Sequence, residues 1–139
     1  MKFRTLSLLA SMVLLAITAL TQNYPQKLAT ATVPFDFVAG DVQMAAGTYT
    51  FRQINPEVIQ IQSKDGHNSA KLAPSSLKWQ KGENGGKVVF KRYGKEYFLS
   101  EIWSSDDKLG RELPVTKRER TMLAGRPSAQ AQNVSLVAR

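Results

Sequence analysis

The sequence predicts an all-β domain, a small antiparallel barrel or sandwich of about seven or eight short strands with a short C-terminal helix or tail. Two observations lead to this fold class. Stretches of alternating apolar and polar residues recur roughly every 8 to 12 residues, and strong turn signals separate them. Most connections are short enough to be hairpins, which favours an up-and-down order of strands. The pattern leaves the choice between barrel and sandwich open.

The 139 residues divide into four predicted parts. Residues 1–21 have the basic start, apolar stretch and polar end of a signal peptide, and the apolar stretch is short for a membrane span. Residues 22–28 are expected to be a linker, 29–124 the β domain with its terminal helix, and 125–139 a flexible basic tail. We therefore expect a periplasmic or secreted protein that meets the membrane only transiently, through its signal peptide. Retention of the N-terminal segment as an anchor is the alternative.

The first half of the β domain contains two clear hairpin partners. Residues 48–54 (TYTFRQI) are rich in β-branched and aromatic side chains, and 57–63 (EVIQIQS) return after an Asn-Pro turn. Residues 29–38 (ATATVPFDFV) also alternate, but Pro34 cannot donate a ladder hydrogen bond, which indicates an edge strand or a bulge. Weaker strands are expected at residues 42–47, 69–73 and 77–80, the last with Trp79 pointing inward.

The central hairpin lies between Lys87 and Pro114, and it fixes the predicted inner face. Gly94 stands at the first central position of a two-residue turn, where a type II′ turn needs a positive φ. This turn places Phe90 opposite Leu99 and Val89 opposite Ser100, whereas a slip of one residue would exchange the two faces. The predicted inner face carries Val88, Phe90, Arg92, Tyr97, Leu99, Glu101 and Trp103.

Two ions, Arg92 and Glu101, lie on this predicted inner face. In a solid core, Glu101 would be half-buried and paired with Arg92 or Arg52, because buried charges are usually paired. In a barrel, Glu101 would line a polar pocket. The second interpretation gives a candidate ligand pocket formed by Phe51, Phe90, Arg92, Tyr97, Leu99, Glu101 and Trp103.

The C-terminal part begins with a last strand at residues 110–115. Thr116 and Glu119 then have the spacing of a capping box, which predicts a short helix over residues 117–124. Residues 128–139 (SAQAQNVSLVAR) are expected to be mostly disordered.

Six further motifs accompany the exported N-terminus: residues 33–37 (VPFDF), 46–49 (AGTY), 63–66 (SKDG), 97–103 (YFLSEIW), 110–114 (GRELP) and 117–120 (KRER). Together they resemble a family of small secreted proteins from acidobacterial-type bacteria, over about residues 30–122. The resemblance implies export and a compact β fold. It implies no activity, cofactor or site residue.

The side chains predict no catalytic, cofactor-binding or metal site. The sequence has one histidine, His67 in a turn, and no cysteine, so thiol chemistry and a zinc site are not supported. Asp106 and Asp107 lack the spacing of a calcium loop, and there is no GxGxxG or P-loop. Interleaved lysines and aromatic residues are typical of single-strand binders, but the expected export argues against nucleic acid as a partner.

The favoured interpretation is an exported, non-enzymatic β domain that binds a small apolar or amphipathic ligand, or an envelope lipid, glycan or protein. The alternative is a structural or interaction protein that docks a partner through a sheet edge or the basic tail. The formal net charge of +8 would favour anionic partners. An enzyme is the third interpretation.

Overall fold

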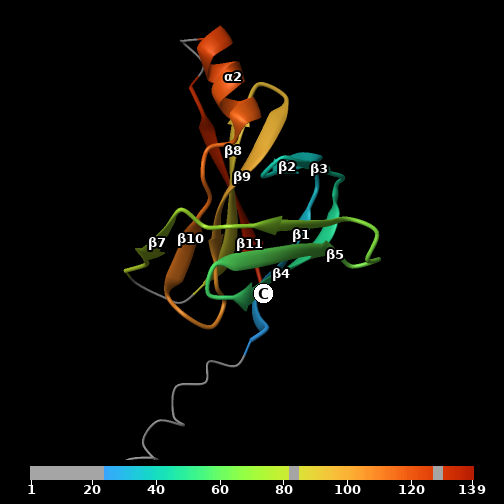
Figure 1. Cartoon of the computed structure of the whole chain (residues 1–139), viewed down its shortest axis with the longest axis vertical. Coiled ribbons are helices and arrows are strands. Elements are labelled where there is room, and N and C mark those ends of the chain that lie inside the picture. Colours follow the sequence, from blue (N-terminus) through green and yellow to red (C-terminus); the bar gives the residue numbers. More distant parts are fainter. Residues whose placement is uncertain (1–23, 82–84, 127–129) are drawn as a thin grey trace, which may run out of the picture.

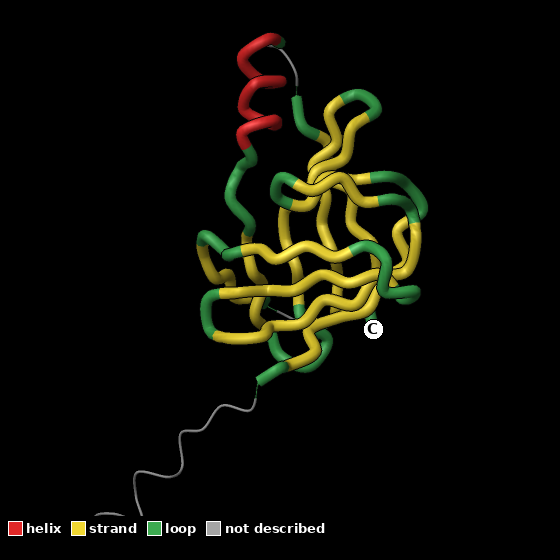
Figure 2. The backbone as a smooth tube through the Cα atoms, turned by 45° about the vertical axis from the view of Figure 1, so that its right-hand side comes forward, coloured by secondary structure: helices red, strands yellow, loops and turns green. Residues whose placement is uncertain are grey.

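The computed structural model describes residues 24–81, 85–126 and 130–139, so the predicted signal peptide lies outside the described residues. Figures 1 and 2 show two β-sheets packed face to face, with one helix at one end of the sandwich, beside the tip of the central hairpin. The all-β prediction is confirmed, and of its two forms the structure is sandwich-like and not a closed barrel.

The described residues form eleven strands and one helix. There are more strands than expected, in part because residues 29–38 divide at Pro34 into two strands and because residues 132–138 form a strand where disorder was expected. The predicted linker is also shorter, since β1 begins within it. The elements are β1 (Gln26–Val33), β2 (Phe37–Ala39), β3 (Val42–Met44), β4 (Gly47–Asn55), β5 (Val58–Ser63), β6 (Ser69–Leu72), β7 (Ser76–Trp79), β8 (Gly86–Tyr93), β9 (Glu96–Trp103), β10 (Leu109–Glu112), α2 (Lys117–Gly125) and β11 (Gln132–Ala138).

The first sheet is an antiparallel meander in the order β1-β4-β5-β6. Phe51 of β4 opposes Ile61 of β5, after a bulge between Gln53 and Asn55 has shifted the register set next to the Asn-Pro turn. β1 is an edge strand that ends at Val33, immediately before Pro34, as the missing proline donor predicts.

The second sheet has the order β11-β8-β9-β10-β7. The short hairpin of β2 and β3 adds to it, because β2 runs parallel to β9 where Val38 pairs with Phe98. Gly94 has a φ of +64°, which agrees with the predicted turn. The predicted register is confirmed from the turn as far as the pair Phe90 and Leu99.

Beyond that pair, a β-bulge changes the register of the hairpin. Val89 opposes Glu101 and not Ser100, so the ladder shifts by one residue. Ile102 consequently pairs with Val88 in the core and is fully buried. Glu101 and Trp103 move to the opposite face of the sheet, and their predicted inward orientation is therefore wrong.

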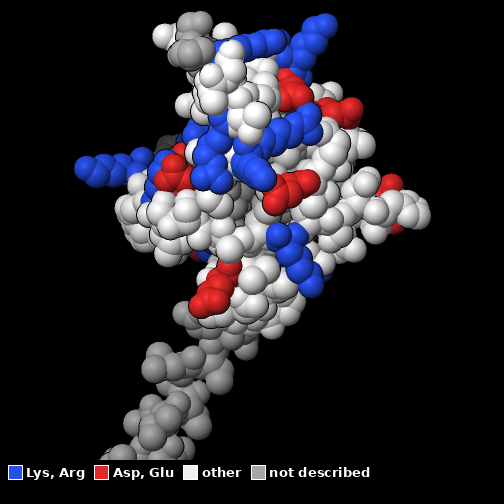
Figure 3. All heavy atoms as spheres, turned by 45° about the horizontal axis from the view of Figure 1, so that its top comes forward, with Lys and Arg blue, Asp and Glu red and all other residues white. Residues whose placement is uncertain are grey.

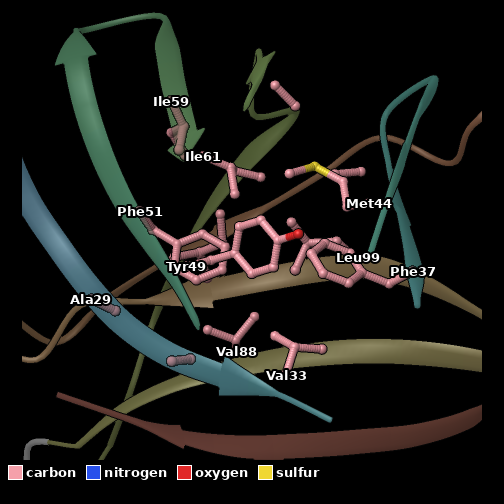
Figure 4. Close-up of a cluster of buried hydrophobic side chains, with 14 of the residues drawn as sticks. Ala29, Val33, Phe37, Met44, Tyr49, Phe51, Ile59, Ile61, Val88 and Leu99 are labelled. Carbon is pink, nitrogen blue, oxygen red and sulfur yellow. The ribbon is translucent and has the colours of Figure 1, made fainter. Parts of the chain in front are cut away.

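The core lies between the two sheets and is formed by aliphatic and aromatic side chains from both (Figure 4). Its centre is a group of rings in edge-to-face contact. The ring centre of Phe37 lies 5.2 Å from those of Tyr49 and Phe90. The ring centres of Phe35 and Phe90 are 5.1 Å apart. Such contacts add to the free energy gained from burial alone.

Helix α2 covers the outer face of β8 and β9 at one end of the sandwich. Thr116 caps the helix as predicted, because its hydroxyl accepts a hydrogen bond from the N–H of Glu119 at 3.0 Å. The carboxylate of Glu119 accepts a 2.7 Å bond from the Tyr93 hydroxyl, where a capping box would have it accept from the Thr116 N–H. Met122 and Leu123 pack on a small second core under the helix.

The prediction of a disordered tail is wrong for residues 132–138, which form strand β11 beside β8. Val134 and Leu136 alternate with polar residues and pack against the main core, which provides the free energy that orders the strand. The next residue, Arg139, exchanges two backbone hydrogen bonds with Thr30 of β1, at 2.6 and 2.9 Å. The two sheets are therefore joined along this side.

Because Tyr93 is hydrogen-bonded to Glu119, we expect the protein to lose stability at high pH. Burial, followed by the hydrogen bond and charge of Glu119, raises the pKa of Tyr93 from 10.0 to about 12. Because the pKa is raised in the folded state, this contribution to stability is complete below pH 10 and is lost as the pH rises towards 12. Titration by phenolate absorbance should show a late phase whose amplitude Tyr93→Phe reduces, while Tyr49, whose pKa is also raised by burial, continues to titrate late. A Tyr93→Phe curve identical to the wild-type curve would contradict this assignment.

Candidate functional site

An open groove of about 1080 Å³ lies where the two sheets separate. The β4–β5 turn and the start of β1 form one wall, and β7 and β10 form the other. Polar side chains at its floor include Gln53 and Arg111, and its rim includes Pro56, Pro74 and Leu77.

The groove exists because the chain crosses here from one sheet to the other. β6 ends at Leu72, and Pro74 lies in the short link before β7. Proline has no N–H to continue a ladder, so the link leaves the first sheet. The N–H of Ser75 then donates to the Glu112 carbonyl at 2.8 Å and starts the pairing of β7 with β10.

Arg111 is the buried charge at the groove, with 4% of its surface exposed. Its Nε donates to Gln53 Oε1 and its Nη1 to the Leu109 carbonyl, each at 3.1 Å. Its Nη2 lies 3.6 Å from Asp107 Oδ2, which is an ion-pair distance but beyond hydrogen-bond length. A guanidinium has five N–H donors, so the terminal nitrogens retain donors for an anionic group that enters the groove.

Strand β7 gives the groove an apolar rim. Leu77 lines the groove and is 65% exposed. Trp79 is 67% exposed and lies two residues further along β7, but it is not among the residues that line the groove. The predicted strand at residues 77–80 is confirmed in position, but the predicted inward orientation of Trp79 is wrong. The apolar rim residues Pro56, Pro74 and Leu77, beside a charged floor, suit a ligand that has both kinds of surface.

The structure does not bring the seven residues of the predicted pocket together. Phe51, Phe90 and Leu99 are buried in the packed core between the sheets. Tyr97 stacks on Phe35 with ring centres 3.7 Å apart, and Arg92 is exposed near the hairpin turn. The predicted pocket assumed a hollow barrel, whereas these apolar side chains fill a sandwich.

The other two predicted residues, Glu101 and Trp103, lie on the outer face of the second sheet. Glu101 is half-buried and paired, as one interpretation expected, but its partner is Lys78 at 2.7 Å and not either arginine. The Trp103 Nε1 also donates to Glu101, at 2.9 Å. Burial raises the pKa of Glu101, but the hydrogen bonds from Lys78 and Trp103 outweigh it, so this pKa lies below its usual value. Glu101 is therefore an ionised structural group.

The hydroxyl groups near the groove donate to structural acceptors. Ser75 Oγ donates to the Glu112 carbonyl at 3.2 Å, and Ser76 Oγ donates to the Glu112 carboxylate at 2.8 Å. The bond from Ser76 is the main cause that lowers the pKa of Glu112, which makes this carboxylate a weak general base. Among the described residues, no three His, Asp or Glu side chains lie close enough to hold a metal ion.

Comparison of the chain with protein-family models, with curated proteins and with solved structures found no match. Function is therefore inferred from the groove, the sheet edges and the surface charge of this chain. Within residues 24–81, 85–126 and 130–139, no helix has both the length and the apolar character needed to cross a bilayer.

Sequence reasoning missed the residues that form this groove. Arg111 was not singled out, and its partner Gln53 lies 58 positions earlier in the chain. Leu77 had one available signal, because a four-residue strand between Pro74 and a glycine-rich loop is a natural edge strand. That signal indicates an exposed edge but does not locate a groove.

Proposed function

We propose that this chain is an exported, non-enzymatic β-sandwich protein that binds a small amphipathic molecule in the groove beside β7 and β10. The observation that carries the proposal is Arg111, a guanidinium with 4% of its surface exposed at the floor of a groove rimmed by apolar side chains. An anionic head group would take the remaining guanidinium donors. An apolar chain would cover Leu77, whose exposed surface is unfavourable in water.

The size of the groove fits this class of ligand. Its volume of about 1080 Å³ lies just above the range of small-molecule sites, which is roughly 300 to 1,000 Å³. A lipid-like or detergent-like molecule of an envelope has this size and this division into head and chain. Export is supported by the signal-peptide pattern of residues 1–21.

The chemistry of the groove supports binding without catalysis. Both hydroxyls beside it, those of Ser75 and Ser76, donate to Glu112 and have no histidine as their acceptor. His67 is exposed in the β5–β6 turn and is not among the residues that line the groove. A nucleophile needs an adjacent general base, and the described lining residues do not supply that pair.

If the ligand covers Leu77, Leu77→Asp should weaken binding of a dansyl-labelled medium-chain fatty acid by roughly ten- to a hundredfold. Burial of a leucine side chain contributes about 1.5–3 kcal/mol to the free energy of binding. Fluorescence titration of the purified protein would measure this change. Val137→Asp is the matched control, because Val137 is 87% exposed on β11, the strand at the opposite edge of the same sheet. Equal affinities of the two variants would refute the proposal that the fatty acid binds in the groove.

Two probes that differ only in their head group show whether Arg111 recognises the anionic group of the ligand or only supports the structure of the groove. Arg111→Gln should weaken binding of the labelled fatty acid much more than binding of the corresponding labelled alcohol. Thermal unfolding of the variant would show whether the fold is retained. An equal loss for both probes would mean that Arg111 supports the structure of the groove and does not recognise the head group.

A second candidate, docking of a partner through a sheet edge, is favoured by β7. In its ladder the Gln80 N–H donates to the Lys108 carbonyl, so the backbone groups of Leu77 and Trp79 point away from β10. Among the described residues no strand pairs with that edge. Native mass spectrometry of protein purified from its own cells would distinguish the candidates. A small excess mass lost on denaturation supports the groove, and a mass that includes a second chain supports the edge.

A further inference from the structure

The structure gathers positive charge at the end of the sandwich where α2 lies. The tip of the β8–β9 hairpin and the helix with its C-cap meet there, and we call this surface the basic pole. It contains seven basic residues against two acidic ones, Glu96 and Glu119. Figure 3 shows that Lys and Arg side chains dominate this end of the molecule. The basic residues are Lys91, Arg92, Lys95, Lys117, Arg118, Arg120 and Arg126.

Both acidic residues of the basic pole are already engaged. Glu119 is 4% exposed and accepts a hydrogen bond from Tyr93. Glu96 pairs with Arg118 at 2.5 Å. Lys95, Lys117 and Arg120 are exposed, and none of the ion pairs within the described residues includes them. Their charge is therefore available to an outside partner.

The helix is held firmly enough to present these charges together. Thr116 caps its first turn, and Met122 and Leu123 pack on the second core. Figure 2 shows α2 projecting past the ends of the strands, so its exposed side can approach an extended surface without interference from the sheets. Charges on a fixed element lose less conformational entropy on binding than charges on a mobile tail.

We propose that the basic pole docks on an anionic phospholipid membrane. Lys and Arg side chains held near such a surface are attracted by its negative potential, and each contributes roughly a fivefold factor to partitioning. The inference is independent of the groove, which lies among other elements, β1, β4, β7 and β10.

A membrane fits the basic pole better than single-stranded nucleic acid does. Proteins that bind single strands stack the bases on exposed aromatic rings. Here Tyr93 is 7% exposed beneath α2, and Tyr97 is stacked on Phe35. The described aromatic residues of this end thus offer no stacking platform, whereas a phospholipid surface needs only the exposed charges.

The test compares two variants that lose the same charge at different places. The pole variant combines Lys95→Gln, Lys117→Gln and Arg120→Gln. The matched control combines Lys27→Gln, Lys64→Gln and Lys71→Gln, three exposed lysines of the first sheet and its turns. Co-sedimentation with vesicles of phosphatidylglycerol and phosphatidylcholine gives the partition coefficient, and pure phosphatidylcholine vesicles give the background.

Wild-type protein and the control should bind the anionic vesicles, and the pole variant should bind on the order of 100-fold more weakly. Leu77→Asp, which disables the groove, should bind vesicles as the wild type does. Equal losses in the two triple variants, or equal binding to both kinds of vesicle, would overturn the proposal. Binding to soluble polyglutamate without binding to vesicles would also overturn it and would assign the basic pole to an acidic polymer. Circular dichroism would establish that every variant is folded.

Discussion

Phe90→Ala is expected to lower the free energy of unfolding by about 3 to 5 kcal/mol, which is a large part of the stability of a domain of this size. Phe90 is fully buried, and two other phenylalanine rings meet it edge to face at 5.1 and 5.2 Å. Its removal leaves a cavity between two hydrogen-bonded sheets. The ladders restrict how far the surrounding side chains can move to fill that cavity.

Urea denaturation followed by circular dichroism would measure the effect of Phe90→Ala. Phe90→Leu is the matched control, because it keeps most of the apolar volume and should lose only about 1 kcal/mol. A loss below about 1 kcal/mol for the alanine variant would mean that this part of the structure is hollow and not packed. That result would restore the barrel interpretation, in which Phe90 lines a ligand pocket.

Gly110→Ala is expected to destabilise the protein by about 1 to 3 kcal/mol, because the added methyl group has no room. A Cβ at this position would lie 2.6 to 2.7 Å from three atoms of the Trp103 indole. The ring cannot move away freely, since its Nε1 is bonded to Glu101 and the Lys87 ammonium lies 4.9 Å from its centre. Alanine must therefore displace the ring or bend the β9–β10 ladder.

Thermal unfolding would compare Gly110→Ala with Gly85→Ala, where an added Cβ meets nothing within 4 Å. The second change should leave stability nearly unaltered. A double-mutant cycle with Trp103→Leu tests the cause, because alanine at position 110 should be tolerated once the indole is gone. Gly110→Ala as stable as the wild type would show that Trp103 does not rest on this glycine.

The central hairpin shows how far local sequence determines the fold. Gly94 specifies the turn, and the turn fixes every pair as far as Phe90 and Leu99. The bulge near Ser100 was not predicted, because large apolar residues occur on both faces of β9. Either register buries an apolar residue, Ile102 or Trp103, so these apolar side chains alone do not distinguish the two registers. The signal against the predicted register was the charge of Glu101, which that register placed on the inner face.

The C-terminal strand was missed for a different reason. Polar residues and alanines at its start suggested disorder, yet Val134, Leu136 and Ala138 alternate as a half-buried strand does. The strand forms because β8 offers it an open edge, and a single segment contains no information about that partner. Because β11 is ordered, the two arginines of the predicted basic tail lie in different places. Arg126 is at the C-cap of α2, and Arg139 lies beside β1.

The groove depends still more on contacts between distant parts of the chain. Arg111 meets Gln53 across the gap between the sheets, and Leu77 of the apolar rim lies on a third element, β7. Composition and alternation predicted a binding domain in general terms, but they placed the site in the core. Surface charge was easier to anticipate, because Lys117, Arg118 and Arg120 are close in sequence and α2 keeps them together.

The ion pair between Glu101 and Lys78 has a consequence for how β9 finds its correct alignment. A strand with one apolar face is aligned by that face, but β9 buries residues on both sides and lacks this guide. A one-residue shift would carry the Glu101 carboxylate between the sheets, among rings that cannot solvate it. The Glu101 charge thus adds little to the free energy of unfolding. It does raise the free energy of the misfolded state in which β9 is shifted by one residue. Glu101 therefore helps to select the correct register of β9, because its charge is solvated only outside the core.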